Sequence, residues 1–157
     1  MKQTPKTAGY ALLLWALTFL FFLRVIAEAA AFFLDLGFLP PSWAWEDPTL
    51  PTGKLGLIPY PILLPIQIAI LLFQVKVSAD FSRRYGFWVV PRPSLGRFLL
   101  SFSYLYFAAM ALRYVASMAF FPERRWLGGT VPIFFHFVLA GFLAILARFH
   151  SSAPTKR

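Results

Sequence analysis

Four long apolar runs dominate this sequence and leave few folds open. A helix needs about 20 apolar residues to cross the hydrocarbon core of a bilayer, whereas a membrane β-strand needs only about 10 residues of alternating polarity. The runs are too long and too evenly apolar for strands, so we predict an all-α integral membrane protein with one domain, residues 1–157, folded as a four-helix transmembrane bundle. The predicted spans are about 8–34, 57–75, 98–121 and 131–147.

The composition agrees with this class and argues against several others. Apolar residues make up 59% of the chain and charged residues 13%, against roughly 45–50% and about 25% in soluble domains. The net charge is +9, but the basic residues fall mainly between the apolar runs, so we expect no nucleic-acid partner. The chain has no Cys, which removes thiol chemistry and Cys-bound metals. We expect no metal and no other cofactor.

The distribution of Lys and Arg predicts an orientation. Two lie before the first span, five in the 76–97 loop and three in the 148–157 tail, against three in the other two gaps together. Because cytoplasmic loops carry the excess of Lys and Arg, we predict that both termini and the 76–97 loop are cytoplasmic. The 35–56 loop then faces out, the tail is mobile, and the protein is a multi-pass protein of the cell (plasma or inner) membrane.

The N-terminus also has some features of a signal peptide. Basic residues precede the first apolar run, and Ala27-Glu28-Ala29 has the small residues of a cleavage site. The run is longer than a usual signal sequence, and the apolar character resumes after that site. We therefore favour an uncleaved first span, although the sequence leaves cleavage near residue 29 open.

Several polar residues interrupt the apolar runs. Arg24 and Glu28 are four residues apart, so they share one face of a helix. In the predicted orientation all of these residues fall in the outer half of the bilayer, at least one from each span. We predict that they form an intramembrane polar cluster, which comprises Arg24, Glu28, Gln67, Tyr106, Arg113 and His136.

This cluster has two interpretations. A charge at mid-bilayer costs about 2.5–3.5 kcal/mol on insertion scales, so the charged groups should face one another or the bundle interior. The favoured interpretation is a structural ion-pair network in which Arg24 and Arg113 both neutralise Glu28. The alternative is a ligand or catalytic site, since two Arg against one Glu would suit an anionic group.

Two further features were weighed. His136 and His150 are fourteen residues apart, as in membrane cytochromes, but a single helix cannot give each haem two His ligands without a second copy of the chain. We therefore expect no haem and interpret His150 as an interfacial residue whose polar end reaches out to water. The 83–97 segment is basic and aromatic, and we expect it to contact lipid headgroups or a cytoplasmic partner through Arg83, Arg84, Arg92 and Arg97.

For function we favour a non-catalytic membrane component, either an accessory subunit of a membrane complex or a lipid-binding protein. The expected partners are anionic lipids at the inner face, and other membrane subunits or further copies of the chain. The alternative is a membrane enzyme or carrier for an anionic lipid-linked substrate. In that case Arg24 and Arg113 would hold the anion, and Glu28 or His136 would act as acid or base.

Overall fold

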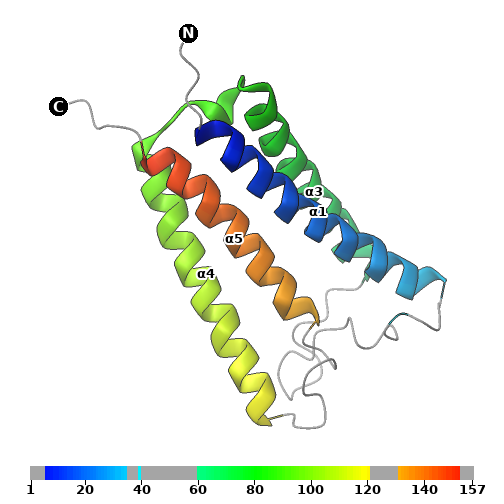
Figure 1. Cartoon of the computed structure of the whole chain (residues 1–157). Helices are drawn as coiled ribbons and strands as arrows, with labels where there is room; N and C mark the ends of the chain where they lie inside the picture. The colour runs from blue at the N-terminus through cyan, green and yellow to red at the C-terminus, as the bar shows by residue number, and fades with distance from the viewer. Residues whose placement is uncertain (1–5, 35–38, 40–59, 121–130, 153–157) are drawn as a thin grey trace.

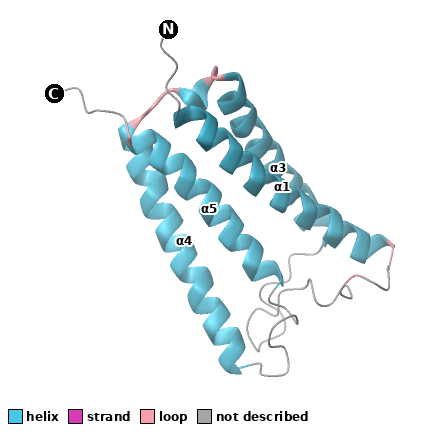
Figure 2. Ribbon diagram, in the orientation of Figure 1, coloured by secondary structure: helices cyan, strands magenta, loops and turns pink. Residues whose placement is uncertain are grey.

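The computed structural model describes residues 6–34, 39, 60–120 and 131–152. All secondary structure in these residues is helical (Figures 1 and 2). The elements are α1 (Lys6–Phe33), α3 (Tyr60–Arg83), the short 3-10 helix η1 (Phe87–Val89), α4 (Pro93–Phe120) and α5 (Val131–Ser151).

Four of these helices are long and apolar enough to cross a membrane. This confirms the predicted all-helical bundle with four candidate spans. The qualifying stretches are Thr7–Phe33, Ile62–Arg83, Pro93–Phe120 and Ile133–Ser151.

α5 lies in the middle of the arrangement. It packs against α1 on one side and α4 on the other, while α3 packs against α1. The beginning of α1, the end of α5 and the 84–92 segment lie at the same end of the molecule, which we call the terminal end (Figure 1). Toward the opposite end α1 and α4 spread apart, with α5 between them (Figure 1). Within the described residues no Cα atom of α1 lies within 8 Å of one in α4.

Two apolar clusters fill the interior. The one nearer the terminal end joins residues of α1, α3 and α5, and the second, around Phe21, Val25 and Val138, lies farther along the helices. In lipid such packing gains little from the hydrophobic effect, because the lipid tails are as apolar as the side chains. Close packing and hydrogen bonds must therefore hold the helices together. The first cluster consists of Leu14, Val77, Phe81, Phe142, Leu146 and Phe149.

Hydrogen bonds between side chains fix how α1 and α3 pair. Glu28 accepts a hydrogen bond from Gln67 at 2.7 Å. The hydroxyls of Thr18 and Ser78 share one at 3.1 Å. Trp15 Nε1 donates to Ser82 Oγ at 2.8 Å. The partners on α3 move toward its C-terminus as those on α1 move toward its N-terminus, so the two helices are antiparallel in one definite register.

Three helices extend farther than the sequence predicts, and one of them, α4, begins at Pro93 instead of near Phe98. α3 continues through Arg83 instead of ending near Val75, and α5 continues through Ser151. Residues 76–83 remain helical because Val77 and Phe81 are buried in the core, while Lys76 and Asp80 form an i, i+4 ion pair. The non-helical part of the predicted 76–97 loop is therefore much shorter than expected. Except for residue 39, the predicted 35–56 loop lies outside the described residues, as does the tail after residue 152.

The turn after α3 depends on one glycine. Gly86 has φ +128°, a conformation that other residues rarely adopt, and a Cβ placed there would lie 2.4 Å from the carboxyl carbon of Asp80. The turn leads into η1, where the Trp88 ring packs edge-on against Phe73 and against His150. The segment is thus folded back onto the ends of α3 and α5.

Candidate functional site

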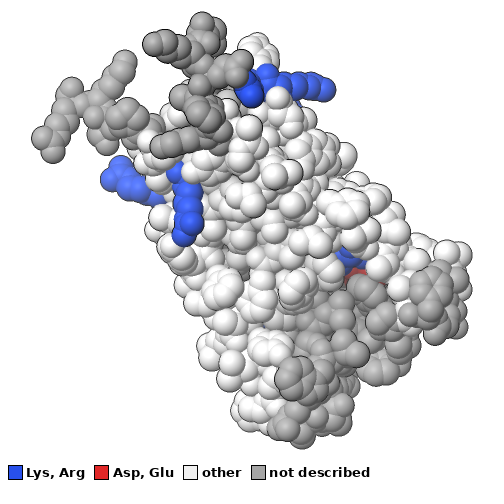
Figure 3. Space-filling view, viewed as in Figure 1, with Lys and Arg blue, Asp and Glu red and all other residues white. Residues whose placement is uncertain are grey.

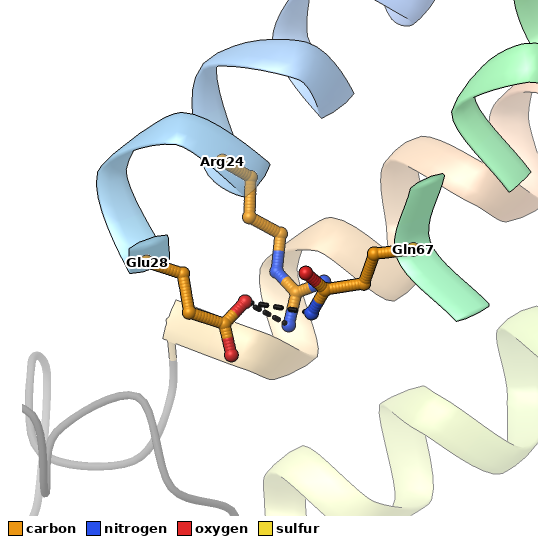
Figure 4. Close-up of polar contacts among 3 residues, drawn as sticks. All are labelled: Arg24, Glu28 and Gln67. Atoms are coloured by element: carbon orange, nitrogen blue, oxygen red, sulfur yellow. Dashed lines mark hydrogen bonds and ion pairs between the residues drawn. The ribbon is translucent and has the colours of Figure 1, made fainter. Parts of the chain in front are cut away.

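Glu28 is the centre of a buried group of polar side chains from α1 and α3. A guanidinium nitrogen of Arg24 lies 3.2 Å from Glu28 Oε2, and the Gln67 amide donates to the same oxygen at 2.7 Å. Figure 4 shows both side chains converging on this oxygen. Exposure is 8% for Arg24, 4% for Glu28 and 2% for Gln67, so the carboxylate is satisfied inside the protein and not by water.

The structure differs from the prediction in the partners of Glu28. Among the described residues Glu28 pairs with Arg24 and Gln67 and not with Arg113, so the predicted contact with Arg113 is wrong. The reason is the position of α5, which separates α1 from α4. The guanidinium of Arg24 also lies over the ring of Phe135, 5.6 Å from its centroid, and this contact joins the ion pair to α5.

A second polar contact joins α4 to α5. The Tyr106 hydroxyl and His136 Nδ1 form a hydrogen bond. The two rings meet edge-on with their centroids 5.7 Å apart, and Phe102 stacks against the other side of Tyr106 at 6.0 Å. This pair is half-buried, in contrast to the fully buried group around Glu28.

The two groups are electrostatic neighbours. The charge of Arg24 acts on both Tyr106 and His136, and the charge of Arg113 acts on His136. Arg113 itself is half-buried on α4. The guanidinium groups of Arg24 on α1 and Arg113 on α4 are therefore both near His136. All six residues named from the sequence fall in one region of the bundle, three around Glu28 and three around His136.

Each group retains hydrogen-bonding capacity. In the Tyr106–His136 pair one partner donates and the other accepts, so either the Nε2–H of His136 or the O–H of Tyr106 remains to donate elsewhere. Within the described residues, neither Tyr106 nor His136 makes a second hydrogen bond. Gln67 Oε1 is also buried without a hydrogen-bond partner. A buried polar atom without a partner is costly, so these atoms mark places where water or a ligand would be stabilised.

The four Arg residues expected to contact lipid lie at the terminal end. Arg83, Arg84 and Arg97 are exposed, whereas Arg92 lies 3.5 Å from the ring centroid of Phe87. Tyr85 is 83% exposed beside them. In the space-filling view most of the visible Lys and Arg atoms lie toward this end (Figure 3).

The interpretation of His150 as a residue that reaches out to water is wrong. Its side chain is fully buried, with its ring against Trp88 and Phe149. The sequence places His150 beside the charged Arg148, which suggested an interfacial position, but the fold-back of η1 covers it. No local sequence signal predicts that His150 is covered, because the cover depends on the turn at Gly86, 64 residues earlier in the chain.

Sequence reasoning also missed two of the contacts that set the site. Thr18–Ser78 and Trp15–Ser82 align α1 with α3 and so place Gln67 opposite Glu28. Part of their signal was available, since Gln67 and Ser78 are eleven residues apart and fall on one face of a helix. Small polar residues of this kind often bond across helices in membranes.

Comparisons of the chain with protein-family models, with curated proteins and with solved structures each give no match. The class of protein defined by the structure is a helical bundle with four helices able to span a membrane.

Proposed function

We propose that this chain is a non-catalytic multi-pass membrane component that binds lipid or another membrane subunit. It lies in a plasma or inner membrane with both termini on the cytoplasmic side. The observation that carries the proposal is the state of Glu28. Arg24 and Gln67 both occupy one oxygen of its buried carboxylate, an arrangement that suits a fixed structural group better than a proton carrier. Through its hydrogen bond with Gln67, the buried carboxylate then serves to hold α1 and α3 in register.

α4 supports the binding role. It packs on α5 alone among the described helices, and 11% of its most apolar stretch is buried, against 44% for α5. Its outward surface is a continuous apolar band that meets lipid tails or the helices of a partner. The large exposed residues of this band are Phe98, Phe102, Tyr104, Leu105, Phe107, Leu112 and Val115.

The terminal end supports contact with anionic lipid. Exposed Arg83, Arg84 and Arg97 lie beside the exposed ring of Tyr85. Aromatic rings favour the headgroup region, and Lys and Arg are attracted by the negative surface of the cytoplasmic leaflet, at about 1 kcal/mol for each residue near the surface. This combination suits the cytoplasmic face.

Site-specific photocrosslinking tests the proposal. Leu105 on α4 and Leu12 on α1 are equally exposed, each at 71%, so a photoreactive residue at either position samples the membrane to the same degree. After crosslinking in intact membranes and mass spectrometry, an accessory subunit should give a discrete protein adduct from position 105. A lipid-binding protein should give a specific lipid adduct there. Identical, unselective lipid adducts from both positions would contradict a binding role for α4.

The second candidate is a membrane enzyme or carrier for an anionic lipid-linked substrate. The specific observation in its favour is the Tyr106–His136 hydrogen bond with two guanidinium groups nearby, since such a pair could pass a proton while the cations hold an anion. Loss of a cellular phenotype in His136→Phe, with unchanged folding and unchanged crosslinks from position 105, would favour this candidate over the first.

A further inference from the structure

The turn that ends α3 has an arginine where a glycine is usual. The Arg84 N–H donates to the Phe81 carbonyl at 3.3 Å, and the Tyr85 N–H donates to the Asp80 carbonyl at 3.2 Å. This pair of hydrogen bonds is the Schellman motif, in which the residue after the helix adopts the left-handed conformation and is most often glycine. Arg84 adopts it with φ +54°. Glycine would form the same turn with less strain, so the turn does not explain the arginine.

Contacts within the described residues do not explain Arg84 either. Its side chain is exposed and makes no hydrogen bond or ion pair there, and the same is true of the neighbouring Arg83. Asp80, the acidic residue closest in sequence, is 3% exposed and pairs with Lys76. The two guanidinium groups are therefore available to a partner outside the chain.

The residues that follow turn apolar groups outward beside these cations. Exposure is 83% for Tyr85 and 54% for both Phe87 and Val90, while Trp88 packs inward against His150. The segment directly follows a helix able to span a membrane, so it lies at the level of the lipid headgroups. Aromatic rings favour this level, and apolar side chains can enter the boundary between headgroups and acyl chains. Cations beside such groups fit a lipid better than an acidic protein surface.

We propose that the turn at Arg84 binds the phosphate of one anionic phospholipid, with Arg83 beside it and the ring of Tyr85 among the headgroups. A guanidinium can donate two parallel hydrogen bonds to phosphate oxygens, and the two backbone hydrogen bonds of the turn hold Arg84 at the end of the helix. The inference rests on the lipid contact proposed above for the terminal end. It deepens that proposal by assigning a discrete headgroup site, in contrast to an attraction shared by every basic residue there.

The test uses the full chain purified in a mild non-ionic detergent, with lipid binding measured by native mass spectrometry. The probes are phosphatidylglycerol and phosphatidylcholine, which has the same phosphate but no net charge. We expect Arg84→Gln to weaken binding of phosphatidylglycerol by about tenfold, the effect of losing one charged hydrogen bond. Arg148→Gln removes one exposed charge from the same end of the molecule. It is the matched control and should bind nearly as the unaltered chain does.

Arg84→Gly separates binding from folding. Because glycine is favoured at φ +54°, this variant should keep or raise the Tm of the unaltered chain and still lose binding of phosphatidylglycerol as Arg84→Gln does. A fall in Tm with binding retained would show that Arg84 serves the fold, and the proposal would be wrong.

Three further results would overturn the site. These are an equal loss in Arg84→Gln and Arg148→Gln, which indicates a shared attraction, no loss in either variant, and equal binding of phosphatidylcholine by the unaltered chain. If one of them is found while position 105 still gives a discrete adduct, the binding role of α4 stands and only the headgroup site is removed.

Discussion

Arg24→Gln removes the only cation that pairs with Glu28 among the described residues, and Glu28 keeps a single polar partner, Gln67. The carboxylate is 4% exposed, so water cannot replace the lost charge. Breaking a buried pair by removing one member costs about 3–5 kcal/mol, because the remaining charge is left uncompensated. At the lower value this corresponds to a fall of roughly 6–12 °C in Tm for a chain of this size.

The double variant Arg24→Gln with Glu28→Gln removes both charges and leaves neutral amides that can bond to each other and to Gln67. We expect it to recover about 0.5–3 kcal/mol relative to the sum of the two single changes, the range found for residues in one network. Gln67→Leu should cost less than Arg24→Gln, since polar contacts between membrane helices average only about 0.6 kcal/mol. The ranking of these variants is therefore set by charge and not by the number of hydrogen bonds lost.

The assay is thermal unfolding of the full chain in detergent, followed by circular dichroism. A second cycle, Glu28→Gln with Arg113→Gln, is the internal control, because α1 and α4 are not in contact and the two losses should add within about 0.3–0.5 kcal/mol. Additive losses for Arg24 and Glu28, or strong coupling between Glu28 and Arg113, would refute the pairing described here.

Three other predictions follow from the fold and from the distribution of charge. A Cys at Ser42 should react with an impermeant thiol reagent in intact cells and a Cys at Ser94, exposed at the start of α4, should not; the reverse pattern would invert the proposed topology. Gly86→Ala should destabilise the protein by about 1–3 kcal/mol, the cost of a strained backbone position, because its Cβ would meet Asp80. Gly9→Ala, with nothing within 4 Å of its Cβ, should be neutral or slightly stabilising in the same unfolding assay. The purified protein should show no Soret band, since both His residues of the chain lie on α5, which cannot give each haem two His ligands, and His150 is buried against Trp88; a Soret band that disappears in His136→Ala would contradict this.

The helical bundle could be predicted from the sequence because it depends on the length of each apolar run, a local property. The Arg24–Glu28 pair could be predicted for the same reason, since residues four apart on a helix are neighbours in any tertiary arrangement. The end of α3 could not, because the charges after Val75 suggested a loop. The helix continues there because Val77 and Phe81 face the core, which only the packing against α1 and α5 reveals.

The partner of Glu28 shows where sequence reasoning stops. Similar depth made both Gln67 and Arg113 available to it, and opposite charge favoured Arg113. Depth does not say which helices touch. Because α5 lies between α1 and α4, the partner of Glu28 is Gln67 and not Arg113. The same position of α5 places His136 beside Tyr106. Order of packing around the bundle is a property of the whole chain and has no local signature in these residues.

The hydrogen bonds that cross between helices divide the molecule into two hairpins. Trp15, Thr18 and Glu28 tie α1 to α3, and Tyr106 ties α4 to α5. Between α1 and α5 the described contacts are apolar side chains and the Arg24–Phe135 contact. We call this interface between the two hairpins the seam. In lipid it separates more easily than the hydrogen-bonded interfaces within each hairpin, because lipid tails can replace its apolar contacts.

We therefore expect each hairpin to form as a unit before the two join. Sliding α3 along α1 by one turn would break three polar contacts together, while parting the hairpins would break none of those contacts. The polar cluster straddles this seam, with Glu28 on one hairpin and His136 on the other. Loosening the seam would therefore move Arg24 on one hairpin away from His136 and Arg113 on the other.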